Sequence, residues 1–380
     1  MLSLDDIVGQ DEAIGRLDAA MVSGRLPHAL LFAGPEGVGR RTTALVLAKT
    51  LLCARAGEAG GAALFGDDVP TPAPRACGQC DDCRMVDSGS HPDLHPVYKE
   101  LAAYHDDPQV RGRKMQQLSI EVVRQFLIAP AGQAPSRGRG KVFIVQQADL
   151  LSRGAQNALL KTLEEPPPGV TLILICRHVE QLLPTTRSRS ALIRFRPLPR
   201  DYVARRLAAA GIDGGEADFW AAFTDGSIGR SLQYHRRGLY ATKRELLDRA
   251  VAAEADDELT DWLVKQMDKL SRQLVSEAKD DGAALADSVA GRRAAAALLE
   301  LLVSGFRDAL RLAGGEGSSL INADQPDVAE ALHRRFDAVR LADVIEQLAR
   351  FEQLLWRNVN AKTIWANVAV TCASAAPLRA

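Results

Sequence analysis

Residues 29–53 read ALLFAGPEGVGRRTTALVLAKTLLC, and this stretch decides the fold. The apolar run at 29–33 predicts a buried strand, the glycines of 34–39 predict a tight loop, and 40–53 favours a helix. A strand, a glycine-rich loop and a helix in this order follow the plan of the phosphate-binding loop GxxxxGK[ST]. The stretch therefore predicts an α/β domain built around a loop of this kind.

The loop keeps its glycines but not its reactive side chains. Gly34, Gly37 and Gly39 leave the backbone able to surround an anion with N–H groups. Arg40 stands where the lysine belongs, and its planar fork is bulkier than an ammonium group. Arg41 stands where a serine or threonine oxygen would ligate Mg²⁺.

The second half of such a site is also changed. After the apolar run at 141–145, a nucleotide hydrolase carries an acidic pair that holds Mg²⁺ and polarises water. Here the two positions are Gln146 and Gln147, which are neutral amides, and Asp149 follows. Together with Arg40 and Arg41, these changes predict that the chain does not turn over ATP. A purely structural loop is favoured over weak nucleotide binding without turnover.

Further apolar runs extend the α/β architecture. Buried strands are predicted at 141–146, 170–176 and 191–198. Helical patterns separate them, one starting near Ser119 and one over 149–165, whereas HPDLHP at 91–96 is interpreted as loop. Helices that alternate with continuous apolar strands indicate a parallel sheet covered on both faces. From about residue 200 onward only helical patterns are found.

Four cysteines are spaced like metal ligands. Cys77, Cys80 and Cys83 are separated by two residues each, and Cys53 ends the helix that follows the glycine loop. Four thiolates suit tetrahedral Zn²⁺, and a closed Cys₄ set leaves no open position for catalysis. The spacing therefore predicts a structural zinc site, with unligated cysteines or an iron–sulfur cluster as alternatives.

Composition excludes several classes of function. Lys and Arg number 47 against 48 Asp and Glu, so no bulk charge draws the chain to nucleic acid or to a membrane surface. The N-terminus lacks the basic and apolar regions of a signal peptide, and no apolar run approaches about 18 residues. A cytoplasmic protein without membrane contact is expected, with reduced cysteines unless they bind metal.

Five stretches in order carry a resemblance to a known family: IVGQDEAI, LPHALLFAGPEGVGR, ALLKTLEEPP, TRSRS and GSIGRSL. The chain resembles the bacterial clamp loaders of the AAA+ class, and among them the delta-prime subunits of DNA polymerase III. The likeness covers about residues 1–235 by specific motifs and the rest by type. It implies a RecA-like AAA+ domain with an inserted Cys₄ module, a small helical lid and a helical collar, at 1–198 (module about 53–83), 199–242 and 243–380.

The resemblance also implies partners. Such a subunit joins delta and gamma/tau subunits in a five-membered ring, which uses ATP to open the beta sliding clamp and place it on primer–template DNA. The ring belongs to the DNA polymerase holoenzyme, nominally a DNA nucleotidyltransferase acting in DNA replication.

Two arginines acquire roles through the resemblance. Relatives carry a Ser-Arg-Cys motif whose arginine enters the neighbouring subunit's ATP site, and here the motif reads Ser188-Arg189-Ser190. Arg189 is therefore the expected arginine finger; Arg187 is its competitor, and a solvated loop arginine is the plain alternative. Arg230 matches the lid arginine that senses the γ-phosphate, and beside a site without turnover we expect it to pack or to form a salt bridge.

The combined hypothesis is a catalytically silent ring subunit that supplies one arginine and a rigid face. An autonomous AAA+ ATPase acting on DNA is the main alternative, and the residues at 40–41 and 146–147 argue against it. A zinc-dependent nucleic-acid-binding module is a third, opposed by the neutral net charge and by the lack of interleaved aromatic and basic residues near Cys77–Cys83.

Overall fold

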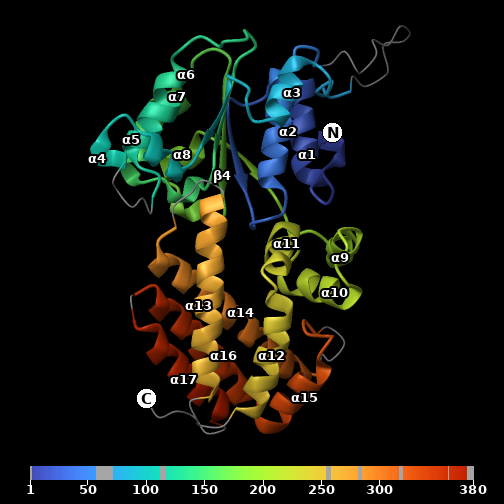
Figure 1. Cartoon of the computed structure of the whole chain (residues 1–380). Helices are drawn as coiled ribbons and strands as arrows, with labels where there is room; N and C mark the ends of the chain where they lie inside the picture. The colour runs from blue at the N-terminus through green and yellow to red at the C-terminus, as the bar shows by residue number, and fades with distance from the viewer. Residues whose placement is uncertain are drawn as a thin grey trace. The chain divides into compact units, whose positions relative to one another are not determined.

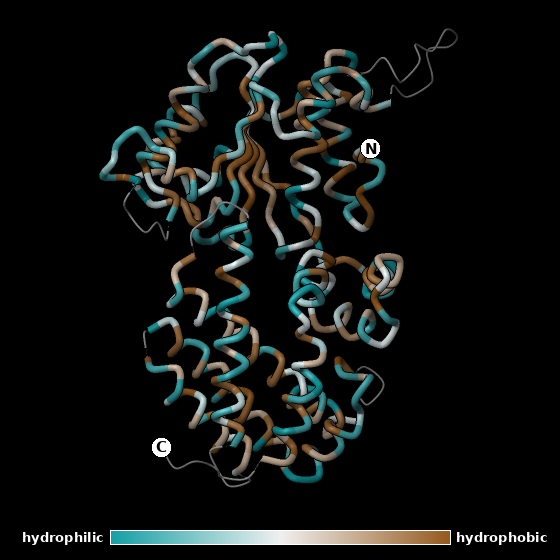
Figure 2. Tube along the Cα trace, in the orientation of Figure 1, coloured by the Kyte–Doolittle hydropathy of each residue, from teal (hydrophilic) through white to brown (hydrophobic). Residues whose placement is uncertain are grey.

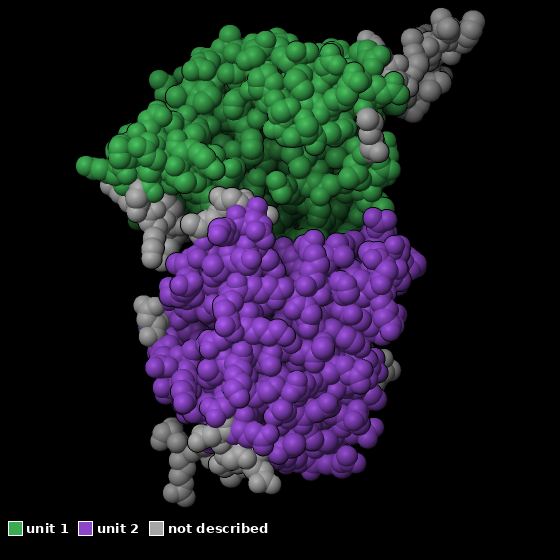
Figure 3. Space-filling model, in the orientation of Figure 1, with its two compact units in different colours: residues 1–199 green, residues 200–380 purple. Residues whose placement is uncertain are grey.

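The computed structural model describes residues 2–56, 72–111, 117–253, 258–280, 285–315, 320–357 and 359–374. The chain divides into two compact units, residues 1–199 and residues 200–380, which Figure 3 shows in separate colours. Unit 1 holds all five described strands, and the described part of unit 2 is helical. The predicted α/β domain followed by a helical C-terminal part is confirmed.

Unit 1 is built on a parallel sheet with the strand order β2-β3-β4-β1-β5. The strands are β1 (Ala29–Ala33), β2 (Leu94–Val97), β3 (Lys141–Val145), β4 (Val170–Cys176) and β5 (Ala191–Arg194). Ala33 pairs in register with Cys176 on one side and with Arg194 on the other. The glycine loop therefore leaves β1 beside the carboxyl ends of β4 and β5.

Helices and short turns precede the first strand and link the others. These elements are η1 (Leu4–Asp6), α1 (Asp11–Val22), α2 (Arg40–Leu52), α3 (Asp81–Asp87), η2 (Lys99–Tyr104), α4 (Pro108–Arg111), α5 (Ile120–Val123), the π-helical η3 (Arg124–Ile128), α6 (Ala129–Ala131), η4 (Ala148–Leu150), α7 (Arg153–Glu164), η5 (Val179–Gln181) and α8 (Pro184–Ser188). Figure 1 shows α1, α2 and α3 on one face of the sheet and α5, α6 and α7 on the other.

The sheet is apolar because both of its faces are covered. Every residue of β1 and β3 is buried, and one hydrophobic core lies on each side of the sheet. The central strands accordingly form the most hydrophobic part of unit 1 (Figure 2). Continuous apolar strands, rather than alternating ones, are what a doubly covered parallel sheet requires.

One strand was not predicted. The interpretation of residues 91–96 as loop is wrong, because Leu94–Val97 form β2, which pairs with β3 at the edge of the sheet. Pro96 lies within this strand. Because proline cannot donate a ladder hydrogen bond, it is found in sheets mainly on edge strands. A proline in the sequence therefore argues against predicting a strand at that place.

Two helix starts depend on serine caps. Ser119 accepts a hydrogen bond from the N–H of Val122, as expected for a helix starting there. The helix predicted from Asp149 is wrong at its start, because Ser152 caps α7 and Asp149 lies in the preceding turn η4. The side chain of an N-cap serine accepts a hydrogen bond from one of the unpaired N–H groups in the first turn, so the local signal was present in the sequence.

Unit 2 consists of α9 (Arg200–Ala209), α10 (Gly214–Phe223), α11 (Ile228–Arg236), α12 (Leu239–Ala252), α13 (Glu258–Asp280), α14 (Asp287–Ala313), α15 (Pro326–Arg335), α16 (Ala338–Leu355) and α17 (Ala361–Ala373). The expected lid and collar both lie in this unit, and the boundary expected at residues 242–243 falls inside α12. No described helix combines the length and the apolar character that a membrane span needs.

A buried lysine connects helices that lie far apart in the sequence of unit 2. Lys243 on α12 is fully buried; its Nζ lies 2.7 Å from a carboxylate oxygen of Asp324 and 4.3 Å from the ring centroid of Phe219 on α10. Burial lowers the pKa of Lys243, and the Asp324 carboxylate opposes that shift. Because a buried charge must be paired, this contact fixes α10, α12 and the segment before α15 to one another.

Candidate functional site

The glycine loop has the backbone of a phosphate cradle. Gly34, Gly37 and Gly39 have φ angles of 153°, 77° and 100°, and α2 starts directly after Gly39. Such left-handed and related conformations turn successive N–H groups toward one concave side. The loop therefore keeps the shape that the sequence predicts for an anion nest.

The side chain of Arg40 is buried rather than exposed to solvent. It is 7% exposed, and its Nη1 donates a hydrogen bond to the carbonyl oxygen of Cys176 at the end of β4. Burial lowers the pKa of Arg40, while the nearby carboxylates of Asp149 and Glu36 favour its charged form. The guanidinium group is thus engaged inside unit 1, at the position where an active loop offers its cation to phosphate.

The position that should ligate Mg²⁺ offers no oxygen. Arg41 is exposed, and among the described residues its side chain makes no ion pair or hydrogen bond. The hydroxyl group of Thr43 donates to the carbonyl oxygen of Gly39 at 3.0 Å. This hydrogen bond thus joins α2 to the last glycine of the loop.

The residues after β3 lie beside the same strand ends. Gln146 is half-buried and Gln147 is exposed, with a positive φ of 53°. Asp149 is buried; its Oδ2 lies 3.9 Å from the Nε of Arg177, and its Oδ1 has no hydrogen-bond partner among the described residues. The glycine loop and the residues after β3 thus lie together at the carboxyl ends of the strands. The buried carboxylate of Asp149 lies near the basic groups of Arg40 and Arg177.

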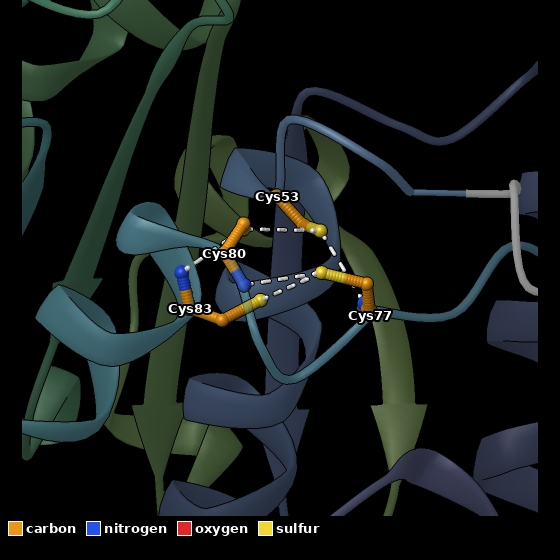
Figure 4. Close-up of side chains that lie close together, drawn as sticks. All are labelled: Cys53, Cys77, Cys80 and Cys83. Carbon is orange, nitrogen blue, oxygen red and sulfur yellow. Dashed lines mark hydrogen bonds between the residues drawn. The ribbon is translucent and has the colours of Figure 1, made fainter.

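The four predicted cysteines meet in space. Cys53 follows the end of α2, Cys80 and Cys83 flank the start of α3, and Cys77 comes from the segment before it (Figure 4). The Sγ atoms of all four lie within 4.8 Å of one another, with Cys53 to Cys80 at 3.7 Å and Cys77 to Cys83 at 4.0 Å. Tetrahedral zinc with Zn–S bonds of about 2.3 Å separates its sulfurs by about 3.8 Å. The sulfur positions therefore fit one tetrahedral ion.

Backbone groups support the thiolate form at this centre. The N–H groups of Cys77, Cys80 and Cys83 donate to the sulfurs of Cys53, Cys77 and Cys80 at 3.3, 3.4 and 3.5 Å. The N–H of Gln79 contributes most to lowering the pKa of Cys77 to about 6, whereas burial raises the pKa of Cys53 and Cys83. A bound divalent cation would offset the burial of these thiolates, so the donor set fits a metal.

The cysteine centre is tied to the helix of the glycine loop. Cys53 itself ends α2, and the Nζ of buried Lys49 on α2 lies 2.6 Å from a carboxylate oxygen of Asp87 on α3. Most of the linker between Cys53 and Cys77, residues 57–71, lies outside the described residues. The centre therefore fixes α3 against α2 on one face of the sheet.

The two candidate finger arginines differ in their surroundings. Arg189 directly follows α8, and its Nη2 lies 2.7 Å from Oε1 of Glu164 at the end of α7. Arg187 is exposed, and no described residue forms an ion pair or hydrogen bond with its side chain. Ser190, which stands in place of the motif's cysteine, is buried and donates to the carbonyl oxygen of Thr186 at 3.0 Å.

Arg230 lies in unit 2, on α11, and its guanidinium is engaged there. Its Nη2 lies 2.8 Å from Oε2 of Glu300 on α14 and 3.1 Å from the hydroxyl oxygen of Tyr234. Tyr234 shares the same carboxylate oxygen at 3.3 Å. Arg230 thus takes part in a salt bridge to the helix α14.

Comparison with known proteins gives the family. The family described as "DNA polymerase III, delta subunit" matches residues 9–199, and "DNA polymerase III, delta subunit, C terminal" matches residues 263–369. The chain belongs to the DNA polymerase III delta-subunit family of clamp-loader proteins. The expected membership in the clamp-loader family is thereby confirmed.

Individual relatives are similar to somewhat more than half of this clamp-loader chain. It is 34% identical over 202 residues to the DNA polymerase III subunit tau of Escherichia coli K12, covering 53% of this chain and 27% of that one. It is 30% identical over 220 residues to the subunit delta' of Bacillus subtilis, covering 58% and 57%. The matched part is thus about a quarter of tau and little more than half of delta'.

One solved structure aligns with most of the clamp-loader chain at low structural similarity. It is a DNA polymerase III gamma subunit-related protein from Thermotoga maritima, 15% identical, with a TM-score of 0.42 and coverage of 94% of this chain and 98% of that one.

One residue that holds the site was missed by sequence reasoning. Gln10 is buried; its Nε2 donates to the carbonyl oxygens of Val38 and Arg196 at 3.2 and 2.8 Å, and its Oε1 accepts from the N–H of Arg196 at 3.0 Å. The side chain thus ties the glycine loop to the segment after β5. It belongs to the motif IVGQ, which was the only available signal.

The glycine loop allows no side chain at its first position. A Cβ on Gly34 would lie 2.3 Å from the carbonyl oxygen of Phe195, and its φ of 153° is strained for other residues. We expect Gly34→Ala to lower the free energy of unfolding by about 2–5 kcal/mol, from backbone strain and overpacking together. Chemical denaturation measures this change.

Gly24→Ala is the matched control, because Gly24 also has a positive φ of 64° but has no atom within 4 Å of its added Cβ. That change should cost only about 1 kcal/mol of backbone strain. Equal costs for the two variants would show that the contact with Phe195 contributes nothing.

Proposed function

We propose that this chain is the delta-prime subunit of the clamp loader, that it does not turn over ATP, and that it supplies Arg189 to the ATP site of a neighbouring subunit. The similarity to both tau and delta' relatives supports a place in the ring but not one subunit type. The subunit type is inferred from the state of the nucleotide site.

The observation that carries the proposal is the burial of Arg40. A phosphate-binding cation must face the cradle, and this one is hydrogen-bonded to Cys176 inside unit 1. The loss of an Mg²⁺ ligand at Arg41 and of acidic groups at Gln146 and Gln147 removes the remaining parts of the reaction. The same residues oppose the alternative of an autonomous AAA+ ATPase.

A subunit that does not turn over ATP can still contribute to the reaction at a neighbouring subunit. Arginine donated in trans stabilises the charge that develops on a transferring phosphoryl group. We infer that residues 199–242 act as a lid and 243–380 as a collar that joins delta and gamma/tau subunits. The ring then loads the beta sliding clamp on primer–template DNA. In this proposal the cysteine centre holds one structural Zn²⁺.

The proposal predicts no ATP turnover by the isolated chain, with or without primed DNA. A steady-state phosphate-release assay is the measurement, and phosphoryl-transfer enzymes set the scale at about 1 s⁻¹ or more. Arg40→Ala serves as the loop variant in the same assay. DNA-stimulated turnover of about 1 s⁻¹ that disappears in Arg40→Ala would contradict the proposal. Turnover that is unaffected by Arg40→Ala would show only that it does not depend on this residue.

A further inference from the structure

Arg189 is held at three points by its own subunit. Its Nη2 lies 2.7 Å from Oε1 of Glu164, and its Nη1 donates to the carbonyl oxygen of Thr185 at 3.1 Å and to Oγ of Ser188 at 3.4 Å. Glu164 is the last residue of α7, and Arg189 follows the last residue of α8. The cation therefore lies where two helix C-termini and one carboxylate supply negative charge.

The two helices that carry this pair are themselves fixed to each other. Gln156 on α7 is buried; its Oε1 accepts from the N–H of Leu183 at 2.7 Å and from the hydroxyl group of Thr186 at 3.4 Å. These contacts fix the first turn of α8 against α7. Glu164 and Arg189 thus sit on one rigid pair of helices, so their contact depends on side-chain rotation and not on a loop.

We propose that Glu164 is a positioning residue for Arg189: its carboxylate holds one edge of the guanidinium so that the rest of the fork is already oriented for phosphate. The inference rests on the proposed function of Arg189. A long arginine side chain loses much rotamer freedom when it is immobilised, and a partner that holds it beforehand lowers that loss at the moment of binding. Arginine has five donors, so one carboxylate leaves others for phosphate oxygens.

The neighbouring residues do not share this arrangement. Glu165 lies one position beyond Glu164 and is exposed, and in the described structure its carboxylate pairs with no basic group. The side chain of Arg187, on the same short helix as Ser188, likewise has no described partner. The sequence therefore supplies a matched control for each member of the pair.

The test is a double-mutant cycle in the reconstituted complex. Glu164→Ala should lower ATP turnover about two- to fivefold, the effect expected of a half-exposed ion pair. Glu164→Gln keeps a hydrogen-bond acceptor without the charge, so its ATP turnover should lie between that of the wild type and that of Glu164→Ala. Arg189→Ala should remove the effect, so that adding Glu164→Ala lowers turnover no further. Glu165→Ala should leave turnover at the wild-type value.

A second readout does not depend on turnover. The side-chain ¹⁵N signals of Arg189, assigned by their loss in Arg189→Ala, should shift or broaden in Glu164→Ala and stay unchanged in Glu165→Ala. Unchanged signals in Glu164→Ala overturn the inference.

The activity outcomes separate the inference from the proposed function. If Arg189→Ala lowers turnover but Glu164→Ala does not, the positioning role is wrong and the finger stands. Increased turnover in Glu164→Ala would mean that the carboxylate restrains the arginine and would overturn the inference. An equal loss with and without Arg189 would show that Glu164 acts elsewhere. If Arg189→Ala has no effect, the proposed function fails and the positioning role fails with it.

Discussion

Changing Arg189 to alanine should lower ATP turnover at the neighbouring site of the reconstituted clamp loader by about 10³- to 10⁵-fold. The reason is that guanidinium stays protonated and bridges two phosphate oxygens where negative charge develops. Turnover of the whole ring should fall in part if its sites fire independently and almost completely if they are coupled. The measurement is clamp- and DNA-stimulated phosphate release, together with clamp loading.

Two variants sharpen this prediction. Arg189→Lys should recover little activity, because an ammonium group offers a point charge without the planar fork. Assembly and metal content should be unchanged in both Arg189 variants, since the side chain is half-exposed and distant in sequence from the cysteines. Wild-type turnover in Arg189→Ala and loss in Arg187→Ala would identify Arg187 as the finger. If ATP turnover is unchanged in both Arg189→Ala and Arg187→Ala, the chain acts only as a scaffold.

Changing Cys80 to serine should abolish binding of the proposed Zn²⁺ and destabilise unit 1. Structural zinc contributes up to about 10–16 kcal/mol of apparent binding free energy in small zinc modules, and this sets the upper limit here. The loss should be smaller than that limit because α2 and α3 also hold each other through Lys49 and Asp87. Thermal unfolding and metal analysis of the purified chain measure the two effects.

Cys372→Ser is the matched control for the metal prediction. Cys372 is also a buried cysteine, but it lies on α17 and outside the Cys₄ set. We expect one zinc per chain to remain in Cys372→Ser and none in Cys80→Ser. Iron in the wild-type chain, or a fully folded wild-type chain without metal, would contradict a structural zinc site.

The sequence by itself determined the elements whose cause is local. The apolar runs at 29–33, 141–145 and 170–176 became central strands because burial on both faces favours apolar residues at nearly every position. The glycines of 34–39 adopted the positive φ angles that only their missing Cβ permits at low cost. The cysteine spacing also sufficed to bring together Cys77, Cys80 and Cys83, because all three lie at or just before the start of one helix.

Only the tertiary structure decided which distant residues meet. Arg40 finds the carbonyl of Cys176 because β1 pairs with β4 in one particular register. Glu164 meets Arg189 because α8 returns against the end of α7. No periodicity or spacing in the chain encodes these contacts, since they depend on strand order and helix packing rather than on local conformation. The glycine loop and the residues after β3 could thus be recognised from the sequence, but the burial of the Arg40 side chain could not.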